Sequence, residues 1–118
     1  MSMELQVNID CAELDRMVDF YTAALGYVAH GSSGTRYRSI VPKDGSGPKL
    51  VFQKVPEAKV VKNRVHLDLI VGEGFEKEAA RFAALGARRL SATPVGDDDC
   101  RWIVMADPEG NELCLCTS

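Results

Sequence analysis

The stretch Ala23-Ala24-Leu25-Gly26 recurs sixty residues later as Ala83-Ala84-Leu85-Gly86, and this repeat decides the fold. At the same offset, Val7-Asn8-Ile9 aligns with Leu67-Asp68-Leu69. Each copy has the same order of segments: an alternating apolar strand, an amphipathic helix closed by a glycine, and further strands. The repeat therefore predicts two modules of the same build within one chain.

Periodicity predicts the elements of the first module. Residues 4–10 alternate between apolar and polar side chains, which is typical of a half-buried strand. Apolar residues at helical spacing predict a helix over 14–25, and Gly26 suits the left-handed end of a helix. Three further strands are expected, after which a linker leads to the second module. We place these strands at 27–30, 35–41 and 49–55, with a turn at 31–34 and the linker at 56–62.

The second module follows the same order. We expect a strand over 64–71, a helix over 75–85 and strands over 87–92, 101–106 and 112–116. The fold class is therefore α+β, with two tandem βαβββ modules that form a curved, cup-like mixed sheet and one helix packed on each half. Because each half is too short to bury an adequate core alone, we expect one domain over 1–118, with modules at 1–56 and 62–118.

Composition excludes several classes of protein. The chain has 118 residues, of which 46% are hydrophobic and 26% are charged, as in an ordinary globular domain. A net charge of −3 disfavours nucleic acid as a partner. No apolar run approaches the roughly 20 residues of a membrane span, and the first residues do not form a signal peptide. We therefore expect a cytoplasmic protein with no membrane partner.

The four cysteines predict free thiols rather than a disulfide framework. Cys11, Cys100, Cys114 and Cys116 contain no Cys-x-x-Cys pair, and no export signal precedes them. Buried thiols in a reducing compartment are the simplest interpretation. Cys114 and Cys116 lie two apart on a predicted strand and therefore share one of its faces.

Four polar residues lie on the strand faces that the helices leave uncovered. Gln6 opens this face on the first strand and His66 on the fifth, while Gln53 and Glu112 lie on the fourth and eighth. If the sheets curl together, the four side chains can converge and offer the oxygen and nitrogen lone pairs that a divalent metal needs. Alternation permits this convergence without proving it. His66 is equally interpreted as a hydrogen-bonded core histidine, Glu112 as a surface charge, and the two glutamines as ordinary polar strand residues.

Several stretches of the double βαβββ pattern carry a family resemblance: Asp15-Arg16, Phe20-Tyr21, Leu50 to Gln53, Lys62 to Leu69, and Trp102 to Cys114. With these residues, which span nearly the whole chain, the sequence resembles the vicinal oxygen chelate superfamily. This superfamily includes glyoxalase I, fosfomycin-resistance proteins, extradiol dioxygenases, methylmalonyl-CoA epimerase and bleomycin-resistance proteins. The small glyoxalase-like domains are the more similar branch.

The resemblance implies a divalent metal (Zn, Ni, Mn or Fe) held by Gln6, Gln53, His66 and Glu112. Gln53 departs from the glutamate usual at its position, and an amide is both a weaker ligand and unable to act as a proton-transferring base. Glyoxalase I activity itself is therefore disfavoured. Glu112 is the acid of this set, as a ligand or as a catalytic base. Further candidates are Asp10 or Asp68 as a second base, and Trp102, Phe52 and Tyr37 as an apolar wall.

Two functions follow from the resemblance. The first is a metal-assisted lyase, isomerase or transferase that acts on a small oxygen-rich substrate, with the metal stabilising negative charge as a Lewis acid. The second is a metal-free protein of the bleomycin-resistance type that sequesters a small ligand, and a regulatory ligand sensor is a third. Exposed sheet edges also predict a homodimer.

Overall fold

The computed structural model of the chain describes residues 2–31 and 34–118. Residues 32 and 33, in the predicted turn at 31–34, lie outside the described residues. The chain divides into two compact units, Met1–Ala58 (unit 1) and Lys59–Ser118 (unit 2), and each is described by itself. Neither of the helices described has the length and apolar character needed to cross a membrane.

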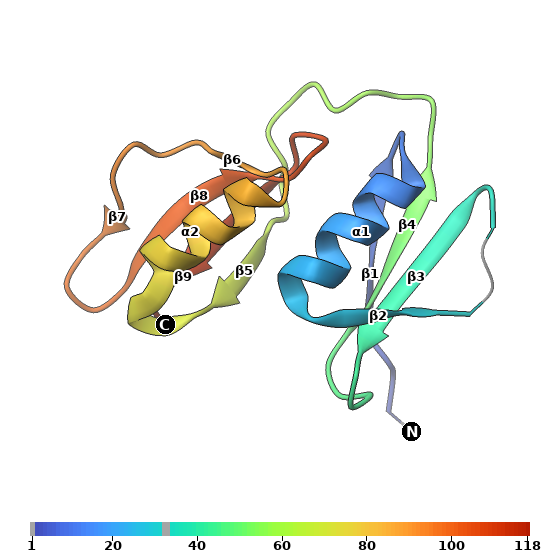
Figure 1. The fold of residues 1–118 in the computed structure, drawn as a ribbon, viewed down its shortest axis with the longest axis horizontal. Helices are drawn as coiled ribbons and strands as arrows, with labels where there is room; N and C mark the ends of the chain where they lie inside the picture. Colours follow the sequence, from blue (N-terminus) through green and yellow to red (C-terminus); the bar gives the residue numbers. More distant parts are fainter. Residues whose placement is uncertain (1, 32–33) are drawn as a thin grey trace. The chain divides into compact units, whose positions relative to one another are not determined.

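Unit 1 is a four-stranded mixed sheet with one helix packed on it (Figure 1). The strand order is β1-β4-β3-β2, in which β1 and β4 are parallel and the other pairs are antiparallel. Met17, Tyr21 and Phe52 are fully buried between helix and sheet, with the two rings stacked 5.4 Å apart. Its elements are β1 (Gln6–Cys11), α1 (Leu14–Leu25), β2 (Tyr27–His30), β3 (Tyr37–Pro42) and β4 (Lys49–Lys54).

Unit 2 repeats this build with small additions. Its sheet has the order β5-β9-β8-β6, with β5 and β9 parallel, and the short β7 also pairs with β8. Helix α2 covers one face, where Phe75, Ala79 and Phe82 are buried (Figure 1). Its elements are β5 (Leu67–Ile70), the 3₁₀ turn η1 (Gly72–Gly74), α2 (Phe75–Ala84), β6 (Arg88–Arg89), β7 (Val95–Gly96), β8 (Arg101–Ala106) and β9 (Glu112–Cys116).

The predicted α+β class is confirmed, with two tandem modules and one helix on each mixed sheet. Helix α1 has the predicted bounds because its buried side chains recur at helical spacing, and Gly26 ends it with φ of 71°. This left-handed conformation favours glycine because a Cβ atom strains it. The strands at 27–30, 101–106 and 112–116 also have the predicted bounds.

Two predicted strands of unit 2 are shorter than expected. The strand predicted over 64–71 covers only Leu67–Ile70, and the chain ahead of it is held by the Asn63 N–H, which donates to the Glu112 carboxylate. The strand predicted over 87–92 is reduced to Arg88–Arg89. Beyond it, the N–H groups of Leu90 and Ser91 both donate to the Val104 carbonyl, so the regular ladder cannot continue.

A buried aspartate builds the turn that leads into β9. Asp107 is only 3% exposed, and its carboxylate accepts hydrogen bonds from the N–H groups of Glu109 and Asn111 and from the Asn111 amide, at 2.9–3.0 Å. Gly110 completes the turn with φ of 91°. The turn therefore fixes where β9 begins and places Glu112 at its start.

Candidate functional site

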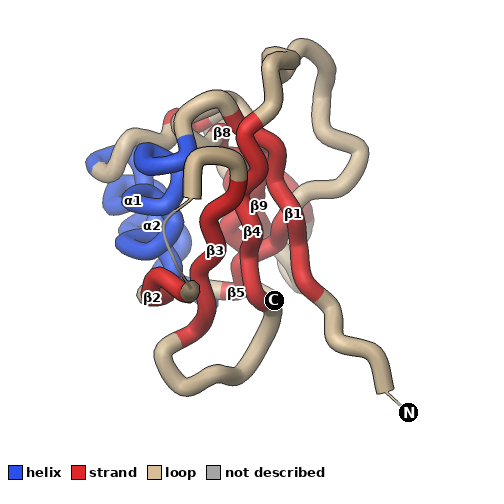
Figure 2. Tube along the Cα trace, turned by 90° about the vertical axis from the view of Figure 1, so that its right-hand side faces the viewer, coloured by secondary structure: helices blue, strands red, loops and turns tan. Residues whose placement is uncertain are grey.

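In unit 2, one face of the sheet packs against helix α2 and the opposite face lines a pocket. Along β8 and β9, the side chains toward α2 are fully buried and apolar, which period-two alternation requires of a helix-covered face. Figure 2 shows the strands of this unit with the helix to one side only. The helix-facing residues are Ile103, Met105, Leu113 and Leu115, each at most 1% exposed.

The opposite face forms a pocket of about 370 Å³ within unit 2. Trp102 and Val104 supply an apolar wall, while acid, base and thiol groups supply the rest. Such a mixture of apolar surface and a few convergent polar groups is typical of small-molecule sites. The polar and thiol residues of the lining are Lys62, His66, Asp68, Glu112, Cys100, Cys114, Cys116 and Ser118.

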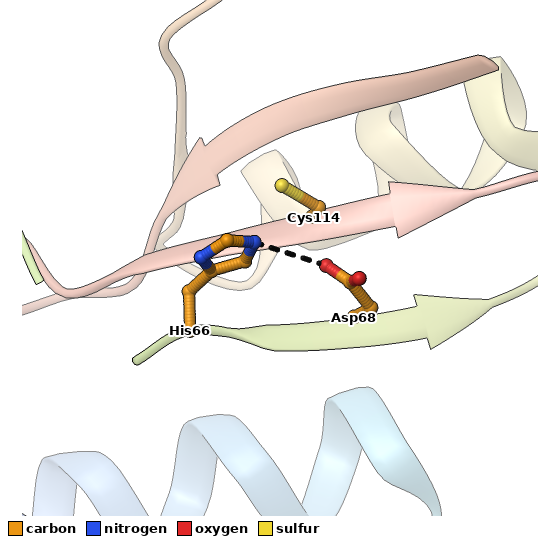
Figure 3. Close-up of side chains that lie close together, drawn as sticks. All are labelled: His66, Asp68 and Cys114. Atoms are coloured by element: carbon orange, nitrogen blue, oxygen red, sulfur yellow. Dashed lines mark ion pairs between the residues drawn. The ribbon is translucent and has the colours of Figure 1, made fainter. Parts of the chain in front are cut away.

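His66, Asp68 and Cys114 converge at one wall of this pocket (Figure 3). One ligand atom from each residue lies within 4.8 Å of the other two, and the His66 Nε2 atom is 3.2 Å from Asp68 Oδ1. The parallel pairing of β5 and β9 produces this arrangement, because Asp68 lies directly opposite Cys114. His66 lies directly before β5, two residues from Asp68, and both side chains line the pocket.

An imidazole nitrogen, a carboxylate oxygen and a sulfur atom are the donors from which proteins build transition-metal sites. Burial raises the pKa of Cys114, and the nearby Asp68 carboxylate raises it further. A nucleophilic cysteine needs the opposite shift, because the thiolate is the reactive form. The raised pKa therefore disfavours thiolate attack, and it is the convergence of the three donor atoms that suits a metal ion, which would displace the thiol proton on binding.

Glu112 is held by the segment that precedes β5. Its carboxylate accepts hydrogen bonds from the Asn63 N–H and from Lys59 Nζ, both at 3.1 Å, and Lys59 Nζ also donates to the Val61 carbonyl at 2.6 Å. Burial acts to raise the pKa of Glu112, but the hydrogen bonds from Asn63 and Lys59 outweigh it and lower the pKa. Glu112 thus stays ionised and ties two segments of unit 2 together.

The two predicted glutamine ligands lie in unit 1, at different ends of one strand pair. Gln6 lies opposite Lys49, whereas Gln53 lies opposite Asp10, four residues further along the parallel pair. Gln53 Oε1 instead accepts a hydrogen bond from the Asn8 amide at 3.2 Å. Gln6 lines a separate hollow of about 690 Å³ within unit 1.

The predicted apolar wall is divided among three environments. Trp102 lines the pocket of unit 2, Phe52 is fully buried in the core of unit 1, and Tyr37 is 50% exposed. Sequence reasoning assigned Cys114 and Cys116 to a shared strand face but overlooked that this face lines a pocket. The available signal was the alternation of β9, which places both thiols on the same side as Glu112.

Comparison with known proteins identifies the family. A family model described as a glyoxalase-like domain matches residues 6–116. The chain therefore belongs to the glyoxalase-like domain family, as the resemblance to the vicinal oxygen chelate superfamily predicted. Among curated proteins, no sequence matches this chain.

Solved structures share the fold at low sequence identity. A glyoxalase/bleomycin resistance protein/dioxygenase family enzyme from Burkholderia phytofirmans PsJN is 20% identical, with a TM-score of 0.75 and 94% of each chain covered. The fosfomycin resistance protein FosX from Listeria monocytogenes, a variant in complex with Mn(II) and 1S,2S-dihydroxypropylphosphonic acid, is 15% identical, with a TM-score of 0.80. That match covers 100% of this chain and 92% of the other. A glyoxalase/bleomycin resistance protein from Albidiferax ferrireducens T118 is 18% identical, with a TM-score of 0.68 and 98% of each chain covered.

Proposed function

We propose that this protein is a metal-assisted enzyme of the glyoxalase-like type, a lyase, isomerase or transferase that binds a small oxygen-rich substrate in the pocket of unit 2. The observation that carries the proposal is the convergence of His66, Asp68 and Cys114 within 4.8 Å at the pocket wall. A divalent metal held there would stabilise negative charge on substrate oxygens as a Lewis acid.

The remaining pocket residues suit the binding of such a substrate. Trp102 and Val104 supply apolar surface against which the non-polar part of a substrate can pack. Lys62, which also lines the pocket, adds a positive charge that suits an anionic oxygen. Asp68 Oδ1 lies 3.2 Å from His66 Nε2, a spacing at which both atoms can contact one metal ion.

The FosX structure supports this class of ligand by analogy. That protein carries Mn(II) together with a dihydroxy phosphonate, a small oxygen-rich molecule. The metal set predicted from the resemblance, Gln6, Gln53, His66 and Glu112, shares only His66 with the cluster described above. Metal binding by the other three stays a prediction, and Glu112 stays a candidate catalytic residue.

Metal analysis of protein purified without chelators tests the proposal. We expect one metal ion per chain in the unaltered protein and a loss of affinity of at least about tenfold in His66→Ala. The matched control is His30→Ala, which removes the histidine that lines the separate hollow of unit 1. Protein that takes up no metal after incubation with Zn, Ni, Mn and Fe salts, or a His66→Ala variant that keeps full affinity, would contradict the proposal.

One observation favours the metal-free alternative, a protein that sequesters a ligand. His66 and Asp68 already contact each other, and the raised pKa of Cys114 keeps its thiol protonated in the absence of metal. These side chains can thus bind a ligand by hydrogen bonds without a metal ion. Ligand binding that survives removal of all metal by a chelator would favour this alternative.

We also propose a homodimer. Strand β5 lies at the edge of the sheet of unit 2, and sheet edges are where a strand of another chain can add. Ile70, in this edge strand, is 62% exposed, and Val65, just before the strand, is 82% exposed. Light scattering over micromolar concentrations should give twice the mass of the 12.9 kDa chain, and a concentration-independent monomer would contradict the dimer.

The thiols support a reducing compartment. Cys114 and Cys116 are free and line the pocket. Because disulfides form in oxidising compartments, we propose a cytoplasmic location.

A further inference from the structure

The pocket of unit 2 has two chemically different ends, because strand pairing fixes where each lining residue lies along β9. Trp102 of β8 lies directly opposite Cys116, the last residue of β9. Val104 is the next pocket residue of β8 and lies opposite Cys114, in the middle of β9. Glu112 begins the strand, four residues before Cys116. Four residues of a strand span about 13 Å, so the two ends of the pocket contact different parts of a ligand.

Lys62 brings a positive charge to the end of the pocket at which β9 begins. It lines the pocket, and the next residue, Asn63, donates its N–H to a Glu112 carboxylate oxygen at 3.1 Å. The Lys62 Nζ atom lies 3.5 Å from the Asn63 carbonyl oxygen, at the outer limit of a hydrogen bond. Within the described part of the chain, no carboxylate forms an ion pair with Lys62. Its ammonium group is therefore available to a negatively charged ligand.

Glu112 fastens the segment that carries Lys62. One of its carboxylate oxygens accepts a hydrogen bond from the Asn63 N–H, and the other accepts one from Lys59 Nζ. Lys59 Nζ also donates to the Val61 carbonyl at 2.6 Å, which closes the segment on itself. The chain is thus held on both sides of Lys62. Because Lys59 balances the charge of Glu112, the positive charge of Lys62 is not cancelled at this end of the pocket.

Trp102 forms the apolar end of the pocket, and the neighbouring strand β7 packs against its ring. Val95 of β7 lies directly opposite Trp102. The Gly96 backbone approaches the ring so closely that a Cβ atom there would lie 2.8 Å from Trp102 Cζ3. A ring held in this way offers a large apolar surface and loses little conformational freedom when a ligand packs on it. The end of the pocket near Cys116 therefore suits the apolar body of a ligand.

We propose that the pocket binds a small amphipathic carboxylate, with its charged head at Lys62 and its apolar body on Trp102, and that Glu112 positions Lys62 for this contact. The inference rests on the proposed function, because it names the class of substrate that the same pocket takes and the direction in which this substrate lies. The lining holds one lysine together with the carboxylates of Asp68 and Glu112. Such a balance suits a head with a single negative charge, because a second charge on the ligand would be repelled by these carboxylates.

Isothermal titration of the purified protein with matched probes tests both ends of the pocket. Phenylacetate carries a charged head and an apolar body, phenylacetamide lacks the charge, and acetate lacks the body. We expect phenylacetate to bind about fivefold more tightly than phenylacetamide, which is the effect of one charge pair that water partly screens. Acetate should bind most weakly, because it buries little apolar surface. Benzylphosphonate, at a pH where it carries two negative charges, should bind more weakly than phenylacetate.

Variants of Lys62 and Glu112 assign the two roles. Lys62→Met should remove the preference for phenylacetate over phenylacetamide, and Lys62→Arg should retain it. The matched control is Lys77→Met, which alters an exposed lysine on α2, the helix on the other face of the sheet. By charge alone, Glu112→Ala should strengthen the binding of an anion. If Glu112 positions Lys62, this variant should instead weaken phenylacetate binding, and adding Lys62→Met should have little further effect.

The fluorescence of Trp102, the single tryptophan of the chain, gives a readout that does not depend on the folding of a variant. In the unaltered protein, saturating phenylacetate and phenylacetamide should both change this fluorescence, and acetate should not. Equal affinity for phenylacetate and phenylacetamide, or a Lys62→Met variant that keeps the preference, would overturn the substrate class. Tighter binding of phenylacetate by Glu112→Ala would overturn the positioning role.

The metal content of the same samples separates this inference from the proposed function. Protein that holds metal but shows no preference for phenylacetate would overturn the substrate class alone. Protein that shows the preference but takes up no metal would overturn the metal-assisted function and support the substrate class as that of a bound ligand.

Discussion

Replacing Glu112 with glutamine separates two roles for this residue, a structural tie within unit 2 and a metal ligand or catalytic acid. In the structure its carboxylate accepts hydrogen bonds from the Asn63 N–H and from Lys59 Nζ, both at 3.1 Å. The side chains of Lys59 and Glu112 are 22% and 13% exposed, so the pair is largely shielded from water. Glutamine preserves the shape of the side chain and removes only its charge.

The magnitude follows from these two contacts. A hydrogen bond to a charged group contributes about 1.5–3 kcal/mol and a neutral one about 1 kcal/mol, so the Asn63 hydrogen bond, which the glutamine carbonyl keeps, is weakened by about 0.5–2 kcal/mol. Loss of the solvent-screened ion pair with Lys59 adds about 0.5–1 kcal/mol. We therefore expect Glu112→Gln to lower the free energy of unfolding by about 1–3 kcal/mol at pH 7. A double-mutant cycle with Lys59→Met should assign about 0.5–1 kcal/mol of this to the ion pair, since a partly exposed pair is screened by solvent.

The pH dependence has a definite sign. The folded protein lowers the pKa of Glu112, so the ionised carboxylate contributes stability above its unfolded pKa of about 4.3. This contribution is lost as the pH falls through the lower, folded pKa. The difference between the unaltered protein and Glu112→Gln should thus be full at pH 7 and shrink as the medium becomes strongly acidic.

Urea unfolding followed by circular dichroism measures these differences, with Glu57→Gln, an exposed carboxylate of unit 1, as the matched control. Equal stability of Glu112→Gln and the unaltered protein at pH 7 would refute the structural tie. If the same variant also lost bound metal, Glu112 would be a ligand, as the resemblance implies. Lost stability with unchanged metal content would instead assign Glu112 to the tie alone.

Three further predictions follow from other contacts. Asp107→Ala removes three hydrogen bonds from the turn before β9 and should lower the free energy of unfolding by about 2–3 kcal/mol, as measured by urea unfolding. Gly96→Ala should lower the free energy of unfolding by about 2 kcal/mol or more in the same assay, because φ of Gly96 is +107° and the new Cβ atom would lie 2.8 Å from the Trp102 ring. The control is Gly74→Ala, whose Cβ atom meets open space and which should be nearly neutral. Burial and Asp68 raise the pKa of Cys116 to about 11, so its alkylation in metal-free protein, followed by mass spectrometry, should accelerate about tenfold per pH unit between roughly pH 8 and 10; a rate that is flat over this range would contradict the shift.

The sequence predicts the buried face of each element well, because burial imposes a period. Helix α1 and strands β2, β8 and β9 have the bounds that apolar spacing indicated. Where hydrogen bonds rather than burial end a strand, the prediction failed. After β6, two N–H groups share the Val104 carbonyl, and this contact leaves no periodic signal in the sequence.

The register of the paired strands is the second feature, after the strand ends, that the spacing of residues in the sequence could not predict. Alternation assigned Gln53 and Glu112 to the uncovered faces of their strands, but it did not say which residue lies opposite each one. The pairing places Gln53 opposite Asp10 and four positions beyond the partner of Gln6. In a parallel pair, four positions correspond to about 13 Å along the strand, so a shared face does not make two residues neighbours.

A comparison of the two copies of the repeat shows why the candidate metal-binding residues lie in unit 2. In both units, the parallel pair presents apolar residues to the helix, Leu50 and Phe52 in one and Leu113 and Leu115 in the other, because each helix needs a buried surface. The opposite face carries no such requirement and differs between the copies. Asn8 in unit 1 corresponds at the repeat offset to Asp68 in unit 2, and their partners in the parallel pairs are Val51 and Cys114. An amide and a methyl-bearing side chain thus stand where the second copy has a carboxylate and a thiol, so only unit 2 combines a metal-ligating set with a pocket among the residues described.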